Sequence, residues 1–358
     1  MTEIPADLKS PAALAKQLKL RIVSPADLLL SRRRSGKGFR YFDEAGKDII
    51  DRARIRRLAS LAVPPAYRDV RYAKDERAHL QAIGYDAAGR LQYRYHADWE
   101  LVREALKGRR LASFAQALPR IRRHVNQQLN ANDLSKAFAI AAVIEFVSLT
   151  VIRAGNEEYA RERGTRGATT LLKSNVVVGK GSMQLRFKAK GAVGVNRDIS
   201  HARLAKIISR LLTLPGRRLF QYRDEAGTVR EIRAGDVNAS LKEIVGAPAS
   251  LKDFRTLVAS ASVLQNLSQL VPAESQRKRR SQILTAVREA AEELSNTPTV
   301  CQKSYVNRAV ISAFENGSLQ KYADALKSGR SKSRTVEILA EIVSSEAVDK
   351  KRSSLPQV

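Results

Sequence analysis

The chain has 358 residues, of which 44% are hydrophobic, so it can form two or three domains with packed cores. Its 64 Lys and Arg against 36 Asp and Glu give a formal net charge of +28 at pH 7, and such an excess favours a polyanionic partner, most often nucleic acid. Ribosomal proteins and binders of anionic membranes are also basic, but most are shorter, more monotonous or more amphipathic than this chain.

Cysteine and histidine are too few and too scattered for a disulfide or a zinc site. Cys301 is the single cysteine, and the four histidines show no metal-ligand spacing. Residues 1–18 lack the apolar core of a signal peptide. The longest apolar stretch, residues 137–152, is too short to span a bilayer and contains Glu145. We therefore expect a cytoplasmic protein, outside the membrane and without a metal or other cofactor; in a bacterium, this location gives access to the chromosome.

The first part of the chain has strand signals. An aromatic stretch at 39–42, a turn at 43–46 and a second stretch at 47–50 predict a hairpin. The pattern recurs as a strand at 80–85, a turn at 86–89 and a strand at 90–96. Between the two, the Pro-Pro segment 63–67 predicts an extended elbow after a short helix. We expect a small, strand-rich, basic domain over residues 1–105.

From Trp99 onward, helical periodicity dominates. The expected helices cover residues 99–106, 111–129, 133–154, 202–213, 234–245, 251–265, 276–295 and 305–317. A strand-rich insertion interrupts them, with a hairpin of residues 170–178 and 183–189 and a third strand that 193–199 could add. The fold class predicted is α+β, with a mainly α domain over 106–320 that carries a β-hairpin insertion, and a C-terminal tail over 321–358.

Two local patterns in the middle of the chain contain cations that could carry chemistry. Arg153 lies at the end of a long apolar helix, shortly before Gly155, which is also typical of an ordinary helix C-terminus. Lys188 and Lys190 come just after a predicted strand, where a lysine in a turn is usually solvated. Each pattern alone favours the structural explanation.

Two further patterns lie later in the chain. The segment 251–256 places Asp253 and Arg255 in the first turn of a helix, where an acidic residue is common. Asn296 begins an Asn-Thr-Pro turn, and Tyr305 comes seven residues after its proline. A tyrosine in such a place often anchors a C-terminal helix to the core.

The order of these patterns is more informative than any one of them. The series consists of an Arg, a Lys in a hairpin, Lys-Asp-x-Arg, and then Asn-Thr-Pro followed by Tyr. In this order the chain resembles the poxvirus-type DNA topoisomerases IB, in the bacterial branch. The resemblance runs from about Ser31 to Gly317, and the segment 84–96 is similar to that family's DNA-clamping domain. It implies a clamp around duplex DNA, single-strand cleavage through a 3′-phosphotyrosine, relaxation of supercoils by swivelling, and religation without ATP.

The resemblance also implies roles for single residues. Tyr305 aligns with the nucleophile, and Arg153 and Arg255 align with the arginines that bind the scissile phosphate. Lys190 aligns with the lysine that protonates the leaving oxygen, and the lysine two residues before it is its rival. Asn296 stands where many members carry a histidine; it can donate the same hydrogen bond but brings no charge.

This assignment agrees with the chemistry. Arginine offers permanently charged, paired donors that match phosphate oxygens, the phenol of a tyrosine must lose a proton as it attacks, and a lysine can act as the acid at the leaving oxygen. The sequence contains no phosphate-binding loop for ATP, because the nearest string, residues 34–38, lacks the glycine spacing.

Duplex DNA is the expected partner, and we expect the enzyme to act as a monomer at the nucleoid. On the strand after the second turn, Gln92 and Arg94 share one face and Tyr93 and Tyr95 the other. One face could lie in the major groove, but the two tyrosines could equally form the core of the small domain. The basic run 276–280 predicts a solvated helix face near phosphates. The residues expected to contact DNA are Gln92, Tyr93, Arg94, Tyr95, Lys188, Arg277 and Arg280.

Two alternatives come from other functional classes. A tyrosine recombinase usually has a histidine three residues before the second arginine, where this chain has Lys252, and its N-terminal region is helical rather than strand-rich. A catalytically silent DNA-binding module would not need the reactive positions, and all of them except the histidine are filled. Both comparisons favour the topoisomerase.

Overall fold

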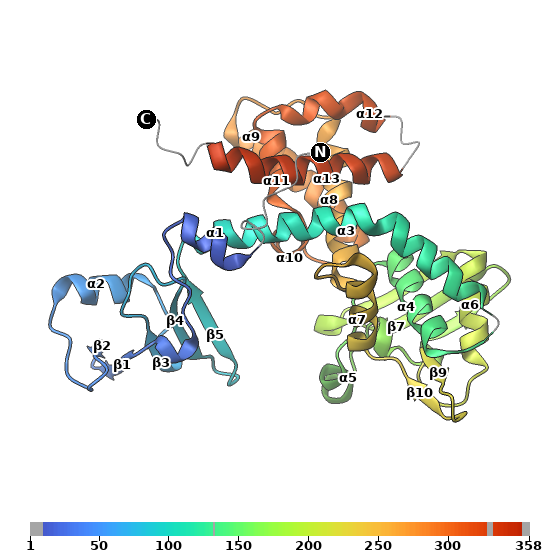
Figure 1. Cartoon of the computed structure of the whole chain (residues 1–358), viewed down its shortest axis with the longest axis horizontal. Coiled ribbons are helices and arrows are strands. Elements are labelled where there is room, and N and C mark those ends of the chain that lie inside the picture. Colours follow the sequence, from blue (N-terminus) through green and yellow to red (C-terminus); the bar gives the residue numbers. More distant parts are fainter. Residues whose placement is uncertain (1–9, 132, 328–331, 353–358) are drawn as a thin grey trace. The chain divides into compact units, whose positions relative to one another are not determined.

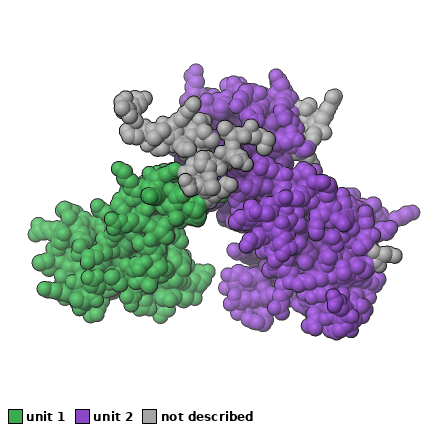
Figure 2. Space-filling model, viewed as in Figure 1, with its two compact units in different colours: residues 1–106 green, residues 107–358 purple. Residues whose placement is uncertain are grey.

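A computed structural model of the chain describes residues 10–131, 133–327 and 332–352. The chain forms two compact units, residues 1–106 and 107–358, which Figure 2 shows in different colours. The first unit is rich in strands, and the second is mainly helical with a small inserted sheet. The predicted α+β fold class is therefore confirmed. Within the described ranges, none of the helices has the length and apolarity needed to cross a membrane.

The first unit is built on an antiparallel sheet with the strand order β2-β1-β3-β4-β5 (Figure 1). Leu58 of a short helix packs into the same buried cluster as Leu30 and Tyr72 of the sheet. The elements of this unit are α1 (Pro11–Gln17), β1 (Leu30–Ser35), β2 (Gly38–Phe42), α2 (Arg52–Ser60), β3 (Arg68–Tyr72), β4 (Leu80–Tyr85) and β5 (Leu91–Tyr95).

One of the two predicted hairpins is confirmed, and the other is wrong. Strands β4 and β5 pair across the expected turn at 86–89. The aromatic strand β2, however, pairs with the upstream strand β1, and the segment 47–50 contributes one isolated bridge, Phe42 to Asp48. The Asp43 carboxylate accepts hydrogen bonds from the backbone of Ala45 and Lys47, so the turn closes locally and the chain enters α2 rather than a long strand.

The second unit is organised around two buried helices, α4 and α8, which share one hydrophobic cluster. Helix α4 is apolar almost all round, which is typical of a helix enclosed by its neighbours. The helices are α3 (Trp99–Asn130, which begins in the first unit), α4 (Lys136–Thr150), α5 (Glu157–Arg163), α6 (Ala202–Leu212), α7 (Ala234–Val245), α8 (Leu251–Ser268), α9 (Gln276–Glu293), α10 (Pro298–Ser304), α11 (Arg308–Glu315), α12 (Ala323–Lys327) and α13 (Lys332–Arg352).

The inserted sheet consists of β6 (Val176–Val178), β7 (Ser182–Lys188) and β8 (Gly194–Ser200), all antiparallel. The predicted hairpin and the third strand are confirmed. Its first strand is shorter than predicted, because residues 168–170 and 173–175 form short 3-10 turns. A second, small ribbon joins β9 (Gln221–Arg223) and β10 (Val229–Glu231).

Helix boundaries differ from the prediction at several places, two of which are the surroundings of Gly108 and of Tyr305. The predicted helices 99–106 and 111–129 are one continuous helix, α3. A Cβ atom added at Gly108 would lie 3.2 Å from the Val343 side chain, so this glycine permits close packing of α13 and does not break the helix. The predicted helix 305–317 does not begin at Tyr305: this residue ends α10, and α11 begins at Arg308.

The segment predicted as a tail contains a packed helix. Ile338, Leu339, Ile342 and Val343 of α13 are buried and belong to the main hydrophobic cluster of the second unit. This helix contacts α8 and α11 (Figure 1). The described part of the tail therefore contributes to the core that carries Tyr305.

Candidate active site

Four of the five residues expected to be catalytic line one pocket of the second unit. Arg153 follows α4, Lys190 lies in the turn between β7 and β8, Arg255 is in the first turn and a half of α8, and Tyr305 ends α10. The cavity volume is about 230 Å³. Its lining holds five cationic side chains and no carboxylate; the cations are Arg153, Arg166, Lys190, Lys252 and Arg255.

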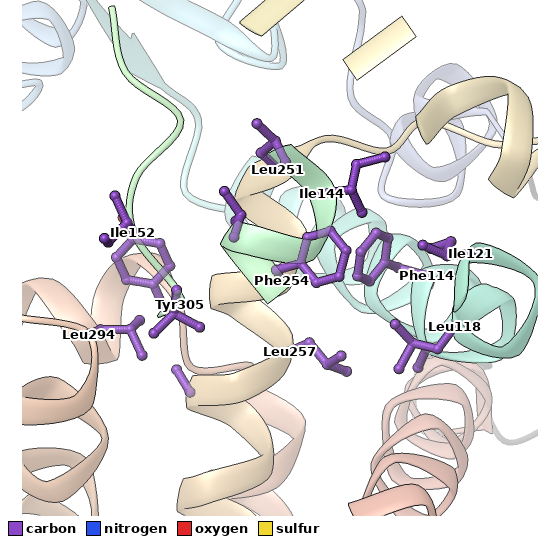
Figure 3. Packing of buried hydrophobic residues seen from close by; sticks show 14 of the residues in the cluster. Phe114, Leu118, Ile121, Ile144, Ile152, Leu251, Phe254, Leu257, Leu294 and Tyr305 are labelled. Atoms are coloured by element: carbon purple, nitrogen blue, oxygen red, sulfur yellow. The ribbon is translucent and has the colours of Figure 1, made fainter. Parts of the chain in front are cut away.

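The ring of Tyr305 is fixed between a hydrophobic side and this pocket. Helix α10 starts at Pro298, with the Thr297 side chain as its N-terminal cap, and the Tyr305 amide donates to the Cys301 carbonyl at 2.9 Å. Tyr305 is 8% exposed and belongs to the cluster that also holds Ile152 and Leu294 (Figure 3). Packing therefore holds the ring while one part of the side chain faces the cations.

Ser260 holds the backbone on either side of Val306. Its hydroxyl donates to the Tyr305 carbonyl at 3.1 Å and accepts from the Asn307 amide at 3.0 Å. Ser260 is fully buried on α8, and the Asn307 side chain in turn caps α11. The helix that carries Arg255 thus also fixes the segment that carries Tyr305.

Cations lie over the phenol ring. The Arg255 guanidinium carbon is 4.7 Å and the Lys252 ammonium 5.6 Å from the ring centroid. Burial raises the pKa of the Tyr305 phenol, but the charge and hydrogen bonding of Arg255, with the charges of Arg153 and Lys252, outweigh burial, so the net pKa is lowered. The site therefore favours the phenolate more than water does.

Arg255 connects three segments of the chain. It is 3% exposed, and its guanidinium donates to the Val151 carbonyl and, at 3.0 Å, to the Leu294 carbonyl. Burial lowers its pKa, but an arginine keeps its charge in proteins. Its Nε is buried without a partner among the described residues. A guanidinium has five N–H donors, so donors remain for a ligand.

The start of α8 is fixed by an ion pair that sequence reasoning missed. Both carboxylate oxygens of Asp253 accept from Arg110 at 2.7 Å, and Asp253 also accepts from the Ser250 amide at 2.7 Å. Asp253 is 6% exposed. Asp253 therefore caps the N-terminus of α8, and it orients the turn that carries Lys252 and Arg255.

Arg153 lies in a tightly packed loop rather than in the predicted helix. Val151 ends α4 with φ +49, a conformation that is uncommon for a β-branched residue and costs about 1–3 kcal/mol. The Arg153 carbonyl accepts from the Ala168 amide at 2.8 Å. A Cβ atom at Gly167 would lie 2.5 Å from the Arg153 carbonyl oxygen and from the Gly155 nitrogen. Only glycine allows this approach, which holds Arg153 in place.

Asn296 contacts the pocket through Arg153. Its side-chain oxygen accepts a hydrogen bond from the Arg153 guanidinium, and its Nδ2 is buried without a partner in the described part of the chain. The preceding residue, Ser295, has φ +50. Arg197 of β8 donates to the Ser295 hydroxyl at 2.7 Å and to the Thr150 carbonyl at 2.9 Å. Arg197 therefore links the inserted sheet to the segments of Arg153 and Asn296.

The two hairpin lysines differ in position. Lys190 is exposed and lines the pocket, whereas Lys188, also exposed, ends β7 and is not a lining residue. Arg166 was not singled out from the sequence, because a lone arginine among 64 basic residues gives no signal. Its amide donates to the Lys188 carbonyl at 2.7 Å, and its side chain lines the pocket.

The residues expected to contact DNA are mostly exposed. Tyr93 and Tyr95 of β5 are 45% and 39% exposed, and their rings stack with centroids 6.1 Å apart; the alternative that they form the core of the small domain is therefore wrong. Arg94 donates to the Ala62 carbonyl, and Gln92 donates to Asp86. Arg277 and Arg280 are exposed at the start of α9.

Two protein-family models match the chain. The catalytic core of eukaryotic DNA topoisomerase I matches residues 97–332, which include every residue of the pocket. The N-terminal domain of bacterial DNA topoisomerase IB matches residues 38–86. The chain belongs to the type IB DNA topoisomerase family. It is also similar to DNA topoisomerase 1B of Acanthamoeba polyphaga mimivirus, with 30% identity over 292 residues that cover 80% of this chain and 87% of the viral protein.

This membership confirms the predicted family and enzyme class: the chain is a type IB DNA topoisomerase, an isomerase that acts on DNA. The match to a bacterial N-terminal domain supports the bacterial branch. The family membership therefore favours the topoisomerase over the two alternatives, the tyrosine recombinase and the catalytically silent DNA-binding module.

Proposed function

We propose that the pocket is the site where one strand of duplex DNA is cut and resealed, with Tyr305 as the nucleophile. The observation that carries this proposal is the placement of the Tyr305 ring against Arg255 and Lys252, in a pocket lined by cations and no carboxylate. A phosphodiester is the anion that such a lining suits, and a lowered phenol pKa favours attack.

In the proposed cleavage step, the Tyr305 oxygen forms a bond to phosphorus as the bond from phosphorus to the 5′-oxygen breaks. The phenol loses its proton to water, and the leaving oxygen takes one from Lys190. Charge that develops on the nonbridging oxygens is stabilised by Arg153 and Arg255. The unpartnered Nδ2 of Asn296 supports a donor role for that residue. Religation reverses these steps, so the bond energy is retained and no ATP is needed.

Lys190 is proposed as the acid in preference to Lys188, because only the former lines the pocket. We propose that Lys188 contacts the DNA backbone nearby. The exposed Arg277 and Arg280 of α9 are suited to phosphate contacts that carry no sequence information.

We further propose that residues 1–105 form the DNA-clamping domain, 106–320 the catalytic domain and 321–358 a C-terminal segment. The exposed stack of Tyr93 and Tyr95 on one face of β5 supports a DNA-contacting strand in the clamp, with Gln92 and Arg94 on the other face of the strand. All side chains of the proposed chemistry come from one chain, so we propose a monomer that acts on nucleoid DNA in the cytoplasm.

The test is a plasmid relaxation assay with purified protein, EDTA present and ATP absent. The proposal predicts relaxation of both negative and positive supercoils under these conditions. A strict requirement for Mg²⁺ or ATP would contradict it, whereas modest stimulation by Mg²⁺ would agree with it because divalent ions also screen DNA.

A further inference from the structure

Arg166 is a cation of the pocket to which the proposed chemistry gives no role. It is half-buried in the loop after α5, and its guanidinium reaches one described acceptor, the Thr170 carbonyl, at 3.4 Å. It forms no ion pair among the described residues. The nearby carboxylate of Glu157 is instead bonded to Arg218. Placing a cation partly out of water without an anionic partner is costly, so this side chain is suited to an anion that arrives from outside.

The electrostatics around Arg166 support this view. Burial lowers the pKa of its guanidinium, and the nearby charges of Arg218 and Arg217 lower it further, although the charge of Glu157 opposes them and the net pKa is lowered. The two arginines repel Arg166, and an anionic ligand would relieve both the repulsion and the desolvation. None of the residues that line the pocket is acidic, so the pocket itself does not supply this anion.

The charge of the pocket exceeds what one phosphate needs. In the proposed chemistry, Arg153 and Arg255 bind the scissile phosphate, Lys190 serves the leaving oxygen, and Lys252 lies over the phenol ring. Arg166 remains as a fifth cation. A DNA strand carries one negative charge per nucleotide, so a strand that enters the pocket brings a second phosphate next to the scissile one.

The position of Arg166 indicates which neighbouring phosphate this is. Its amide donates to the Lys188 carbonyl at 2.7 Å, directly before the turn that carries Lys190. It also lines a smaller cavity together with Ala189, Leu294 and Ser295. The backbone bond to Lys188 places Arg166 next to the turn that carries Lys190, which is the side of the pocket where the leaving oxygen is proposed to be.

We propose that Arg166 binds the first phosphate of the leaving strand, the one next to the scissile bond, and so retains that strand for religation. This inference rests on the proposed function of the pocket. We expect cleavage not to require the contact, because the proposed chemistry assigns the phenol of Tyr305 and the scissile phosphate to other cations of the pocket. After cleavage, the leaving strand is held by base pairing and by such contacts alone, so loss of Arg166 slows resealing and allows more turns per cleavage event.

The test starts from the covalent adduct formed on a truncated duplex, to which an acceptor strand with a free 5′-hydroxyl is added. The measured quantity is the acceptor concentration that gives half-maximal religation. For Arg166→Ala, we expect this concentration to rise about tenfold, while the rate of adduct formation stays within about threefold of wild type. Arg161→Ala is the matched control: it removes the same charge from an exposed arginine on α5 outside the pocket and should change neither quantity by more than about twofold.

A second arm uses an acceptor in which a neutral methylphosphonate replaces its first internal phosphate. With the wild-type enzyme, this replacement should raise the half-maximal concentration about tenfold, and with Arg166→Ala it should add nothing. Equal effects on both enzymes, or an unchanged half-maximal concentration for Arg166→Ala, would overturn the inference. If Arg166→Ala does not fold, the test is the wild-type enzyme with the methylphosphonate acceptor. A half-maximal concentration that this replacement does not change would then overturn the inference. The absence of any adduct on wild-type protein would instead contradict the proposed function itself.

Discussion

The buried hydroxyl of Ser260 provides a sharp test of how the structure positions Tyr305. Ser260→Ala removes one oxygen and leaves two buried backbone groups, the Tyr305 carbonyl and the Asn307 amide, without this partner. An unsatisfied buried group costs about 1–3 kcal/mol, so we expect a loss of at least about 2 kcal/mol in the free energy of unfolding. The freed segment carries the phenol, and a misplacement of about 1 Å can slow a reaction about a hundredfold.

Single-turnover cleavage by Ser260→Ala should therefore fall about 10- to 100-fold, while DNA affinity stays within about twofold because the cations of the pocket are unchanged. The assay is adduct formation under enzyme excess, paired with thermal unfolding and a DNA-binding titration. Ser268→Ala is the control, since this serine is also buried on α8 but its hydroxyl donates to the Gln265 carbonyl of the same helix. A cleavage rate of Ser260→Ala equal to that of the wild type would refute the argument that Ser260 positions Tyr305.

Three further predictions concern the acid, the phenol and the last helix. Lys190→Ala should slow cleavage with DNA binding nearly intact, Lys188→Ala should do less, and a substrate with sulfur as the leaving atom should rescue the former; failure of that rescue would contradict the acid assignment. The cleavage rate should rise with pH until the lowered pKa of the Tyr305 phenol is reached. Lys252→Gln removes a charge that lowers this pKa, so the rising part of the pH–rate profile should move to higher pH. A profile that does not move would contradict the electrostatic account. Leu339→Ala removes a fully buried side chain from α13 and should cost about 2–5 kcal/mol, read as a fall of at least about 4 °C in the melting temperature, whereas the exposed Arg334→Ala should change it little.

The fold was predictable where the signal was local. The hairpin of β4 and β5 follows from alternating residues on both sides of an Asp-Ala-Ala-Gly turn, and the inserted sheet follows from similar cues. The partner of β2 was not predictable, because pairing with the arginine-rich β1 depends on tertiary contacts and not on a hydrophobic pattern. The predicted gap between the helices 99–106 and 111–129 was wrong for a related reason. Gly108 in this gap permits the close approach of α13, which lies more than two hundred residues later in the chain.

The residues of the site were likewise predictable only in part. The four predicted catalytic residues that line the pocket were identified from the order of motifs along the chain. No local pattern showed that they meet. Ser260, Arg110 and Arg166 carried no signal, since a serine or arginine within a helix or loop is ordinary in so basic a chain. The contacts of Ser260 and Arg110 became visible only when residues more than forty positions apart were brought together.

The central claim is that Tyr305 forms the covalent bond to DNA, and locating that bond tests it most directly. The wild-type reaction is stopped by denaturation, the DNA is digested, and the peptide that carries the remaining nucleotide is identified by mass spectrometry, with Tyr305→Phe as the control. The account predicts a nucleotide attached through a 3′-phosphate to Tyr305, a free 5′-hydroxyl on the other side of the nick, and neither adduct nor relaxation with the phenylalanine variant. An adduct on one of the nine other tyrosines, on a serine or at the 5′ end, or relaxation by Tyr305→Phe, would contradict it.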